Sequence, residues 1–301
     1  MYQTLARISR RLPRSRNKVR AMKLLARIIP PRCNATVRMR DGTLVVLDPR
    51  SRTEGEPFWD GVFDEQTVGV LAACLTFGPV AYDVGANVGL VALPLARHAA
   101  RISGGRVVAF EPVPSNAQRI RDGIVLNALE SVLRLFPTAL GDSEGRIEMA
   151  VEARHGATTG NAMMRPDTPG DAALRKVSAT VSRLDDLVER EQLPAPDVMK
   201  LDVEGAEPLV LAGAAATITR HRPIILGEFH SKLMPSFGKT FAEIGGEFLA
   251  RDYRIYAFTR DFRLARITEP KAGQGNVLLV PEGKAEKLES LFAELDRKSP
   301  T

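Results

Sequence analysis

The chain has 301 residues, of which 44% are apolar and 26% are charged. This composition excludes a disordered chain, a collagen-like repeat and a disulfide-rich scaffold, and the length fits one large domain or two small ones. The formal net charge is +6, but residues 1–40 hold twelve of the 42 Lys and Arg residues and no Asp or Glu. The rest of the chain therefore has a net charge of −6, so a basic leader precedes a mildly acidic body.

The basic leader spans residues 1–31, and three interpretations of it stay open. In the first interpretation it is an exposed and partly helical extension. In the second, residues 1–29 form an amphipathic helix that lies on an anionic membrane. In the third, it binds nucleic acid. The lack of interleaved aromatic residues argues against nucleic acid. The apolar residues that recur at helical spacing are Leu5, Ile8, Leu12, Val19, Met22, Leu25 and Ile29.

The sequence also bears on where the protein is found. No stretch approaches the ~20 apolar residues that span a bilayer, and Arg interrupts every short apolar run of the leader, which excludes a secretory signal. The Arg-rich, acid-free composition does resemble that of a mitochondrial transit peptide. Cys33 and Cys74 have no metal-binding or CxxC spacing, which fits a reducing compartment. We expect a cytoplasmic protein that contacts at most the inner face of a membrane.

Residues 32–78 predict a β-hairpin followed by a helix. The segments ATVRMR and TLVVLD alternate in hydropathy around Asp41-Gly42, a strong hairpin signal. The segment FDEQTVGVLAACL has helical apolar spacing and is expected to end near Gly78.

From residue 79 to 285, short apolar runs alternate with helical patterns. The expected strands are VAYDV, RVVAFE, LRLFPTAL, DVMKLDVE and PIILGEF, with YRIYAF and NVLLV as a closing antiparallel pair. This alternation predicts βαβ units and therefore an α/β fold with a mostly parallel sheet. The final residues, 286–301, are expected to form a helix and a tail. Residues 154–172 form a long loop, and such loops are often lids.

The segment VAYDVGANVG indicates a ligand site at the carboxyl end of a strand. Asp83 ends the strand, and Gly85, Asn87 and Gly89 form a tight turn into a helix. Glycine permits positive φ, and the start of a helix offers unpaired N–H groups. The G-x-G-x-x-G motif of dinucleotide folds is absent, whereas Glu111 ends the next strand, where an acid can accept ribose hydroxyls. The pattern favours S-adenosylmethionine over NAD, with a purely structural turn as the alternative.

A second group of charged residues lies in MKLDVEGAE. Lys200, Asp202 and Glu204 alternate and are expected on one face of a strand. Either a Lys–carboxylate pair closes the strand end, or Asp202 and Glu204 orient an acceptor hydroxyl or ligate a divalent metal. On the next strand Glu228 and His230 alternate in the same way, which makes Glu228 a further metal-ligand candidate and His230 a candidate general base.

The motifs DVGANVG, FEPVP, LNAL and KLDVEGAE, in this order and spacing, resemble the FkbM family of S-adenosylmethionine-dependent methyltransferases over about residues 55–260. The resemblance implies a doubly wound, seven-stranded Rossmann-like sheet with the cofactor at the carboxyl ends of strands one to three. It also implies methyl transfer, usually to a hydroxyl, with Glu111 at the ribose. The cofactor-binding residues implied in this way are Asp83, Gly85, Ala86, Asn87, Gly89, Glu111, Ala139, Leu140 and Asp142.

These features predict an S-adenosylmethionine-dependent O-methyltransferase whose acceptor is a small molecule, a sugar or a lipid-linked glycan. The alternatives are a nicotinamide-dependent oxidoreductase and a non-catalytic protein that binds a cofactor or a membrane. The acidic body disfavours a nucleic-acid acceptor, because phosphate backbones require a basic surface. The basic residues that could contact an acidic group of the acceptor are Arg154, Arg165, Lys232 and Lys239.

Overall fold

The computed structural model describes residues 2–12, 17–18, 20–22, 24, 33–51, 53–152, 174–230, 232–258, 263–271 and 276–298. The long loop expected at 154–172, with Arg154 and Arg165, lies outside these residues, as do Val19, Leu25 and Ile29 of the leader.

The chain before the main sheet contains a helix, a hairpin and two further helices. The hairpin predicted around Asp41-Gly42 is confirmed, because its two strands pair antiparallel with Ala35 opposite Leu47. Asp64 caps the last helix by accepting a hydrogen bond from the N–H of Thr67. The elements are α1 (Tyr2–Arg11), β1 (Ala35–Arg38), β2 (Leu44–Leu47), α3 (Gly55–Asp60), α4 (Glu65–Cys74) and the 3₁₀ turn η1 (Leu75–Phe77).

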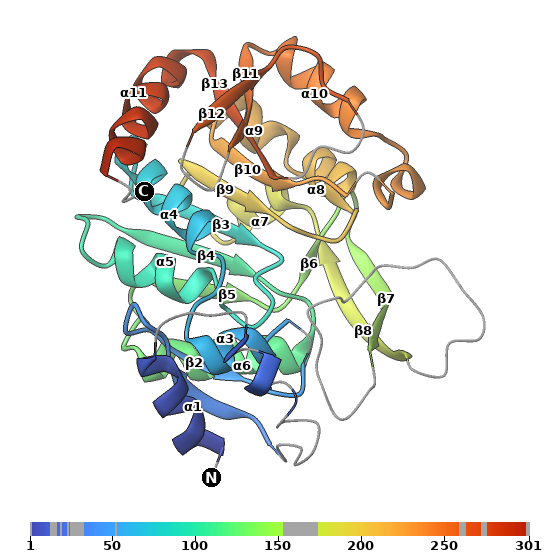
Figure 1. Ribbon diagram of the computed structural model, residues 1–301. Coiled ribbons are helices and arrows are strands. Elements are labelled where there is room, and N and C mark those ends of the chain that lie inside the picture. The colour runs from blue at the N-terminus through green and yellow to red at the C-terminus, as the bar shows by residue number, and fades with distance from the viewer. Residues whose placement is uncertain are drawn as a thin grey trace.

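The main sheet has eight strands in the order β12-β11-β13-β10-β9-β3-β4-β5 (Figure 1). The run from β10 to β5 is parallel, whereas β13, β11 and β12 join it through antiparallel pairs. The predicted α/β fold with a mostly parallel sheet is confirmed, but the sheet has one strand more than the expected seven because β12 pairs with β11 at its edge. The strands are β3 (Val80–Val84), β4 (Arg106–Phe110), β5 (Leu133–Phe136), β9 (Val198–Leu201), β10 (Ile224–Glu228), β11 (Tyr253–Phe258), β12 (Leu264–Ile267) and β13 (Asn276–Pro281).

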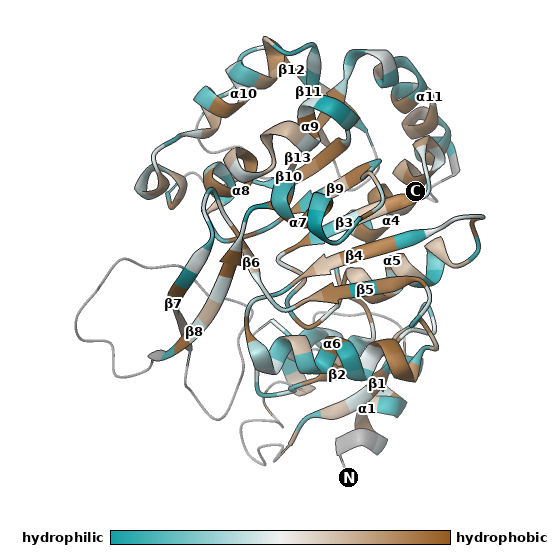
Figure 2. Ribbon diagram, turned by 180° about the vertical axis from the view of Figure 1, so that it is seen from behind, coloured by the Kyte–Doolittle hydropathy of each residue, from teal (hydrophilic) through white to brown (hydrophobic). Residues whose placement is uncertain are grey.

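Helices cover both faces of this sheet (Figure 2). Neighbouring strand residues such as Ala81 and Tyr82 belong to different apolar clusters, one with α4, α5, α6 and α11 and the other with α7 to α10. Burial on both faces explains why the strands are apolar throughout instead of alternating. The helices that follow β3 in the chain are α5 (Ala92–Ala99), α6 (Pro114–Leu126), α7 (Leu184–Arg190), α8 (Glu207–Gly213), α9 (Ala215–His221), α10 (Phe241–Leu249) and α11 (Glu282–Lys298).

A smaller sheet of three strands extends from the body near the carboxyl ends of the parallel strands (Figure 1). Its strands are β6 (Ala139–Leu140), β7 (Gly145–Glu152) and β8 (Leu174–Ser182). The central strand β8 pairs parallel with β6 and antiparallel with β7. This sheet brings residues of the chain segment after β5 to the edge where the cavity described below lies.

No helix among the described residues is long and apolar enough to cross a membrane. Cys33 is exposed, Cys74 is buried, and both are free thiols. Helix α1 of the basic leader packs against α3, where Arg10 Nη1 donates a hydrogen bond to the carbonyl oxygen of Phe58 at 2.7 Å.

A buried ion pair joins the N-terminal elements to the main domain. Glu54, which precedes α3, accepts hydrogen bonds from Arg119 of α6 at 2.5 and 3.2 Å, and its Oε2 also accepts from the N–H of Asp48. The two side chains are 0% and 4% exposed. A charge that loses its partner at such a depth cannot be solvated, so this pair fixes α3 against α6.

We predict that Glu54→Ala lowers the free energy of unfolding by about 3–5 kcal/mol, because it leaves the Arg119 guanidinium buried without its main carboxylate. Urea denaturation followed by circular dichroism measures this. Lys176→Ala, which breaks the exposed pair with Glu148, is the control and costs about 1 kcal/mol or less. Equal losses for the two variants would contradict the role given to the buried pair.

Candidate functional site

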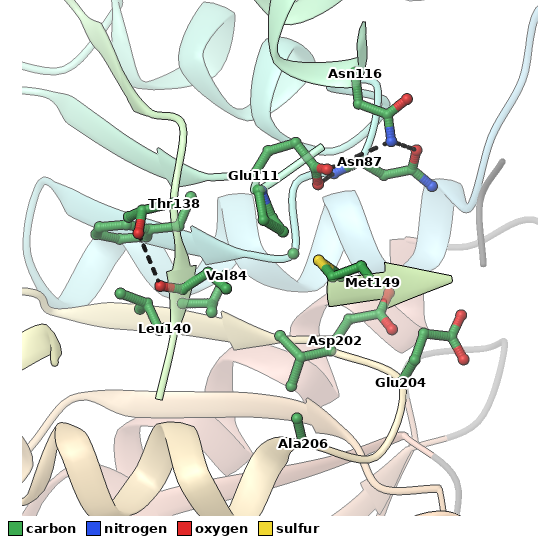
Figure 3. Close-up of a pocket in the computed structure, with 15 residues that line it drawn as sticks. Val84, Asn87, Glu111, Asn116, Thr138, Leu140, Met149, Asp202, Glu204 and Ala206 are labelled. Atoms are coloured by element: carbon green, nitrogen blue, oxygen red, sulfur yellow. Dashed lines mark hydrogen bonds between the residues drawn. The ribbon is translucent and has the colours of Figure 1, made fainter. Parts of the chain in front are cut away.

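A cavity lies at the carboxyl ends of β3, β4 and β9, beside the three-stranded sheet (Figure 3). It is lined by Val84, Gly85, Asn87, Phe110, Glu111, Pro112, Asn116, Thr138, Ala139, Leu140, Met149, Asp202, Val203, Glu204 and Ala206.

The glycine-containing turn after β3 forms one wall of the cavity. Gly85 has φ +82°, and a Cβ at this position would lie 1.9 Å from the carbonyl oxygen of Asp202, so only glycine allows this close approach. The N–H groups of Gly85 and Ala86 both donate to the carbonyl oxygen of Phe110, at 3.0 and 3.1 Å. The turn is therefore tied to the end of β4, and these two N–H groups already have partners within the protein.

Glu111 stands at the end of β4 and faces the turn (Figure 3). Its Oε2 accepts a hydrogen bond from the N–H of Asn87 at 2.8 Å, and its Oε1 accepts one from the N–H of Val113 at 2.9 Å. Burial raises the pKa of Glu111 to about 7, in spite of these two hydrogen bonds. Glu111 is thus a fixed carboxylate with one side toward the cavity.

Asn116, in the first turn of α6, supports Glu111 and was missed in the sequence. Its Nδ2 lies 3.2 Å from Asn87 Oδ1 and 3.4 Å from Glu111 Oε1, and its own oxygen accepts from Arg119 Nη2 at 3.1 Å. A continuous chain of buried hydrogen bonds therefore runs from Glu54 through Arg119 and Asn116 to Glu111. The available signal was an amide residue in the first turn of the helix that follows the Glu111 strand.

Lys200 occupies the space between two carboxylates below the cavity. Its neighbour across the β3–β9 pair is Asp83, and Lys200 Nζ lies 3.5 Å from Asp83 Oδ1 and 3.1 Å from Asp202 Oδ2. Burial by itself would lower the pKa of Lys200, but the charges of Asp202 and Asp83 outweigh it and raise this pKa. Lys200 therefore stays an ammonium ion, and the Lys–carboxylate pair considered from the sequence is present here. Asp83 is fully buried and does not line the cavity, whereas Asp202 does.

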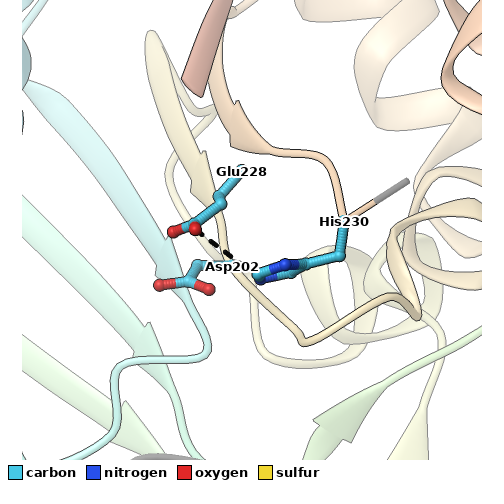
Figure 4. A group of neighbouring side chains, drawn as sticks. All are labelled: Asp202, Glu228 and His230. Atoms are coloured by element: carbon cyan, nitrogen blue, oxygen red, sulfur yellow. Dashed lines mark ion pairs between the residues drawn. The ribbon is translucent and has the colours of Figure 1, made fainter. Parts of the chain in front are cut away.

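Three acidic side chains and a histidine meet beyond the ends of β9 and β10. His230 Nε2 lies 3.5 Å from Glu204 Oε2. It also lies 3.7 Å from Glu228 Oε1 (Figure 4). Burial and the charge of Asp202 raise the pKa values of both glutamates. Glu204 also has φ +53°, a left-handed conformation that costs a non-glycine residue free energy and is often found at functional sites. The residues that alternate in the two sequence motifs thus come together in space.

Asp202, Glu228 and His230 each offer one atom to a common point. These atoms lie within 4.8 Å of one another (Figure 4). Carboxylate oxygens with an imidazole nitrogen are ligands that several divalent metals accept. Glu204, the other metal-ligand candidate, is outside this group, although its Oε2 lies 3.5 Å from the same nitrogen of His230.

The remaining residues implied to bind the cofactor divide into two sets. Gly85, Asn87, Glu111, Ala139 and Leu140 line the cavity, whereas Asp83, Ala86, Gly89 and Asp142 do not. Asp142 is exposed and accepts a hydrogen bond from Ser143. Thr138 and Met149 also line the cavity but were missed, and Met149 reaches it from β7.

Comparison with known proteins places this site in a family. The model of the methyltransferase FkbM domain matches residues 83–255. Hexuronic acid methyltransferase AglP of Haloferax volcanii is 29% identical over 156 residues, which are 52% of this chain and 58% of AglP. The 2-O-methyltransferase NoeI of Sinorhizobium fredii is 28% identical over 158 residues, which are 48% of this chain and 60% of NoeI. The chain therefore matches about three fifths of the length of these curated relatives.

Two solved structures are similar to parts of this fold. A methyltransferase FkbM from Methylobacillus flagellatus KT has 19% sequence identity and a TM-score of 0.42, with 67% of this chain and 43% of that chain covered. An O-methyltransferase from Bacillus cereus, solved in complex with SAH, has 14% identity and a TM-score of 0.41, with 93% and 100% covered.

The family match covers more than half of the chain, from Asp83 in the glycine turn to Ile255 in β11. It includes the wall formed by Glu111 and the cluster around Asp202 and His230. The family resemblance noted in the sequence is thereby confirmed, and the chain belongs to the FkbM methyltransferase family.

Proposed function

We propose that the protein is an S-adenosylmethionine-dependent O-methyltransferase. The observation that carries this proposal is a single cavity with a buried carboxylate, Glu111, on one wall and the acidic residues Asp202 and Glu204 on another (Figure 3). A buried carboxylate such as Glu111 can accept hydrogen bonds from ribose hydroxyls. The negative charges of Asp202 and Glu204 attract a cationic sulfonium. The family membership of the chain supports methyl transfer over hydride transfer, so no observation favours the oxidoreductase alternative.

The residues that line the cavity fit the chemistry of the cofactor. Glu111 would hold the ribose hydroxyls, because its Oε1 and Oε2 are fixed by backbone N–H groups and its carboxylate can still accept further hydrogen bonds. Leu140 offers an apolar surface for the adenine, near Thr138 (Figure 3). Asp202 lies toward the other end, where the sulfonium would be attracted to it.

S-adenosylmethionine supplies, when bound, a methyl group that is already activated by its positive sulfur. The residues of the chain therefore need to place a hydroxyl in line with the S–CH₃ bond, exclude water and take up one proton. As the new C–O bond forms and the S–C bond breaks, the hydroxyl proton has to leave. We infer that His230 takes up this proton, and that the charges of Glu204 and Glu228, whose oxygens lie 3.5 and 3.7 Å from Nε2, stabilise the imidazolium that forms.

The same cluster could also hold a divalent cation. Asp202, Glu228 and His230 would be its ligands, and the cation would lower the pKa of a hydroxyl bound to it. However, Asp202 is already paired with the Lys200 ammonium at 3.1 Å, and this positive charge would repel a second cation. We therefore favour metal-free proton transfer.

We propose a sugar or glycan hydroxyl as the acceptor. The curated relatives support this class, since one is named a hexuronic acid methyltransferase and the other a 2-O-methyltransferase. Lys239 pairs with Glu247 on the surface, whereas Lys232 is exposed two residues after His230. Lys232 is thus the described basic residue that lies nearest in sequence to the proposed base, and it could contact an acidic sugar.

Calorimetry with S-adenosylmethionine and NAD tests the cofactor. We expect binding of S-adenosylmethionine and none of NAD. Glu111→Gln should weaken the binding of S-adenosylmethionine by about 10²–10⁴-fold, because two hydrogen bonds to a charged acceptor are worth about 1.5–3 kcal/mol each. Glu148→Gln changes a carboxylate whose side chain is 66% exposed on β7 and is the control. Wild-type affinity in Glu111→Gln would remove Glu111 from the cofactor site.

The pKa of Glu111 also predicts a pH dependence of cofactor binding. Ribose hydroxyls donate to the ionised carboxylate, so the affinity should fall about tenfold for each pH unit below about 7. Folding stability changes with pH in the opposite direction to cofactor binding. The raised pKa of Glu111 stabilises the folded protein below pH 4.5, the ordinary pKa of a glutamate, and this stabilisation is lost as the pH rises through about 7. Calorimetric titrations across this window measure the effect on binding. Glu111→Gln should show no such slope, and a slope that persists in this variant would assign the effect to another group.

Substitution of His230 tests the proposed base. His230→Gln should lower kcat by about 10²–10⁴-fold, since it removes general base catalysis, while the dissociation constant of S-adenosylmethionine stays within a few fold. Transfer of a labelled methyl group to sugar acceptors measures turnover. His98→Gln changes an exposed histidine on α5 that does not line the cavity and is the control. Full turnover in His230→Gln would refute the assignment.

Treatment with a chelator distinguishes proton transfer to His230 from activation of the hydroxyl by a bound metal ion. We expect EDTA to leave turnover unchanged, because His230 with its two flanking glutamates completes proton transfer without a metal. Mn²⁺ binding followed by electron paramagnetic resonance is the second measurement. Loss of activity with EDTA, its recovery with Mn²⁺, and weaker Mn²⁺ binding in Glu228→Gln would together show that a metal site is needed.

A further inference from the structure

One side of the described part of the basic leader packs against the rest of the protein. Ala6 is fully buried, and Leu5 and Met22 pack against the main apolar cluster. Lys18 forms an ion pair with the buried carboxylate of Asp60 at 2.5 Å. Together with the hydrogen bond of Arg10 to α3, these contacts fix which side of the leader faces outward.

The outward side of the leader consists of Arg7, Ile8, Arg11, Leu12, Arg20 and Leu24, and we call it the leader face. Arg7, Ile8 and Arg11 lie on the side of α1 opposite Ala6, and Leu12 directly follows the helix. Ile8, Leu12 and Leu24 are 53%, 50% and 57% exposed, and they are three of the five large apolar side chains exposed among the described residues. Scattered apolar residues on a surface need no explanation, whereas a group of them at one place marks a site of interaction.

The charge of this region determines which partner it fits. The first 40 residues hold twelve Lys and Arg residues and no acid, whereas the rest of the chain has a net charge of −6. Large apolar side chains next to arginines on one helix side are typical of helices that lie in the interface of an anionic bilayer, where the apolar groups insert and the arginines contact phosphates. We propose that the leader face docks the protein on an anionic lipid bilayer.

Two other partners fit the leader face less well. Residues 3–24 contain no aromatic side chain that could stack on a nucleic-acid base. The leader face of a second copy would bring three further arginines to the same place, with no acid between them to relieve the repulsion. An anionic bilayer satisfies both the arginines and the exposed apolar side chains.

The two other exposed apolar side chains lie at the same end of the molecule as α1. Val125 and Leu126 are 67% and 41% exposed at the carboxyl end of α6. Asn127, the next residue, exchanges hydrogen bonds with the backbone of Leu44 and so attaches this end of α6 to the hairpin. Both views place it at the same end of the molecule as α1 (Figures 1 and 2).

The test is flotation of the full-length protein with vesicles of phosphatidylcholine alone or mixed with phosphatidylglycerol. We expect the protein to float with the anionic vesicles, and less so as salt is added. The variant Arg7→Gln/Arg11→Gln/Arg20→Gln should partition roughly 100-fold more weakly, since each basic residue near an anionic surface contributes about 1 kcal/mol. Ile8→Ser/Leu12→Ser/Leu24→Ser should also float less, although it keeps every charge.

The matched control is Arg146→Gln/Arg190→Gln/Arg263→Gln, which removes three exposed charges from the body and should float like the wild type. Equal melting temperatures and equal binding of S-adenosylmethionine in all variants show that they are folded. Flotation of both leader variants at the wild-type level would overturn the proposal. It would also be overturned if the leader face proved to be needed for binding a single-stranded oligonucleotide, or for a dimer seen by analytical ultracentrifugation, without any effect on flotation.

Discussion

The site depends on one ammonium ion, that of Lys200, between the carboxylates of Asp83 and Asp202. It lies where the chain order of the sheet reverses, since β4 and β5 extend from β3 in one direction and β9 and β10 in the other. A crevice opens at such a reversal, which is where α/β proteins bind ligands. Without Lys200, the buried carboxylate of Asp83 and the half-buried carboxylate of Asp202 would repel each other, and Asp202 would lose its ion pair at the cavity.

The opposite wall of the cavity depends on residues outside the family match. Glu111 is held by Asn87 and Asn116, Asn116 by Arg119, and Arg119 by Glu54, which precedes the matched segment by almost thirty residues. The hairpin and α3 are therefore part of the support of the proposed ribose site. Because the carboxylate partner of Arg119 comes from a distant segment of the chain, no local sequence motif predicts this ion pair.

The sequence predicted those features that depend on local spacing. The hairpin around Asp41-Gly42, the βαβ alternation and the position of Glu111 at the end of its strand all follow from short-range patterns. It did not distinguish Asp83, which is buried under the cavity, from Asp202, which lines it, because both end a strand in an acidic motif. Met149 reaches the cavity through a strand pairing over a long distance in the sequence, which spacing does not reveal.

The acidic body suits the binding of a cationic cofactor, whereas the basic leader suits the binding of an anionic bilayer. The cavity wall is acidic, which suits a sulfonium, and a basic segment next to it would weaken that attraction. Twelve of the basic residues instead lie in the first 40 residues, where α1 packs against α3, and the Glu54–Arg119 pair joins the start of α3 to α6. Because these contacts attach α1 to the body, a bilayer bound to the leader face would fix the direction in which the cavity opens. An acceptor attached to that bilayer would then reach His230 from one side only.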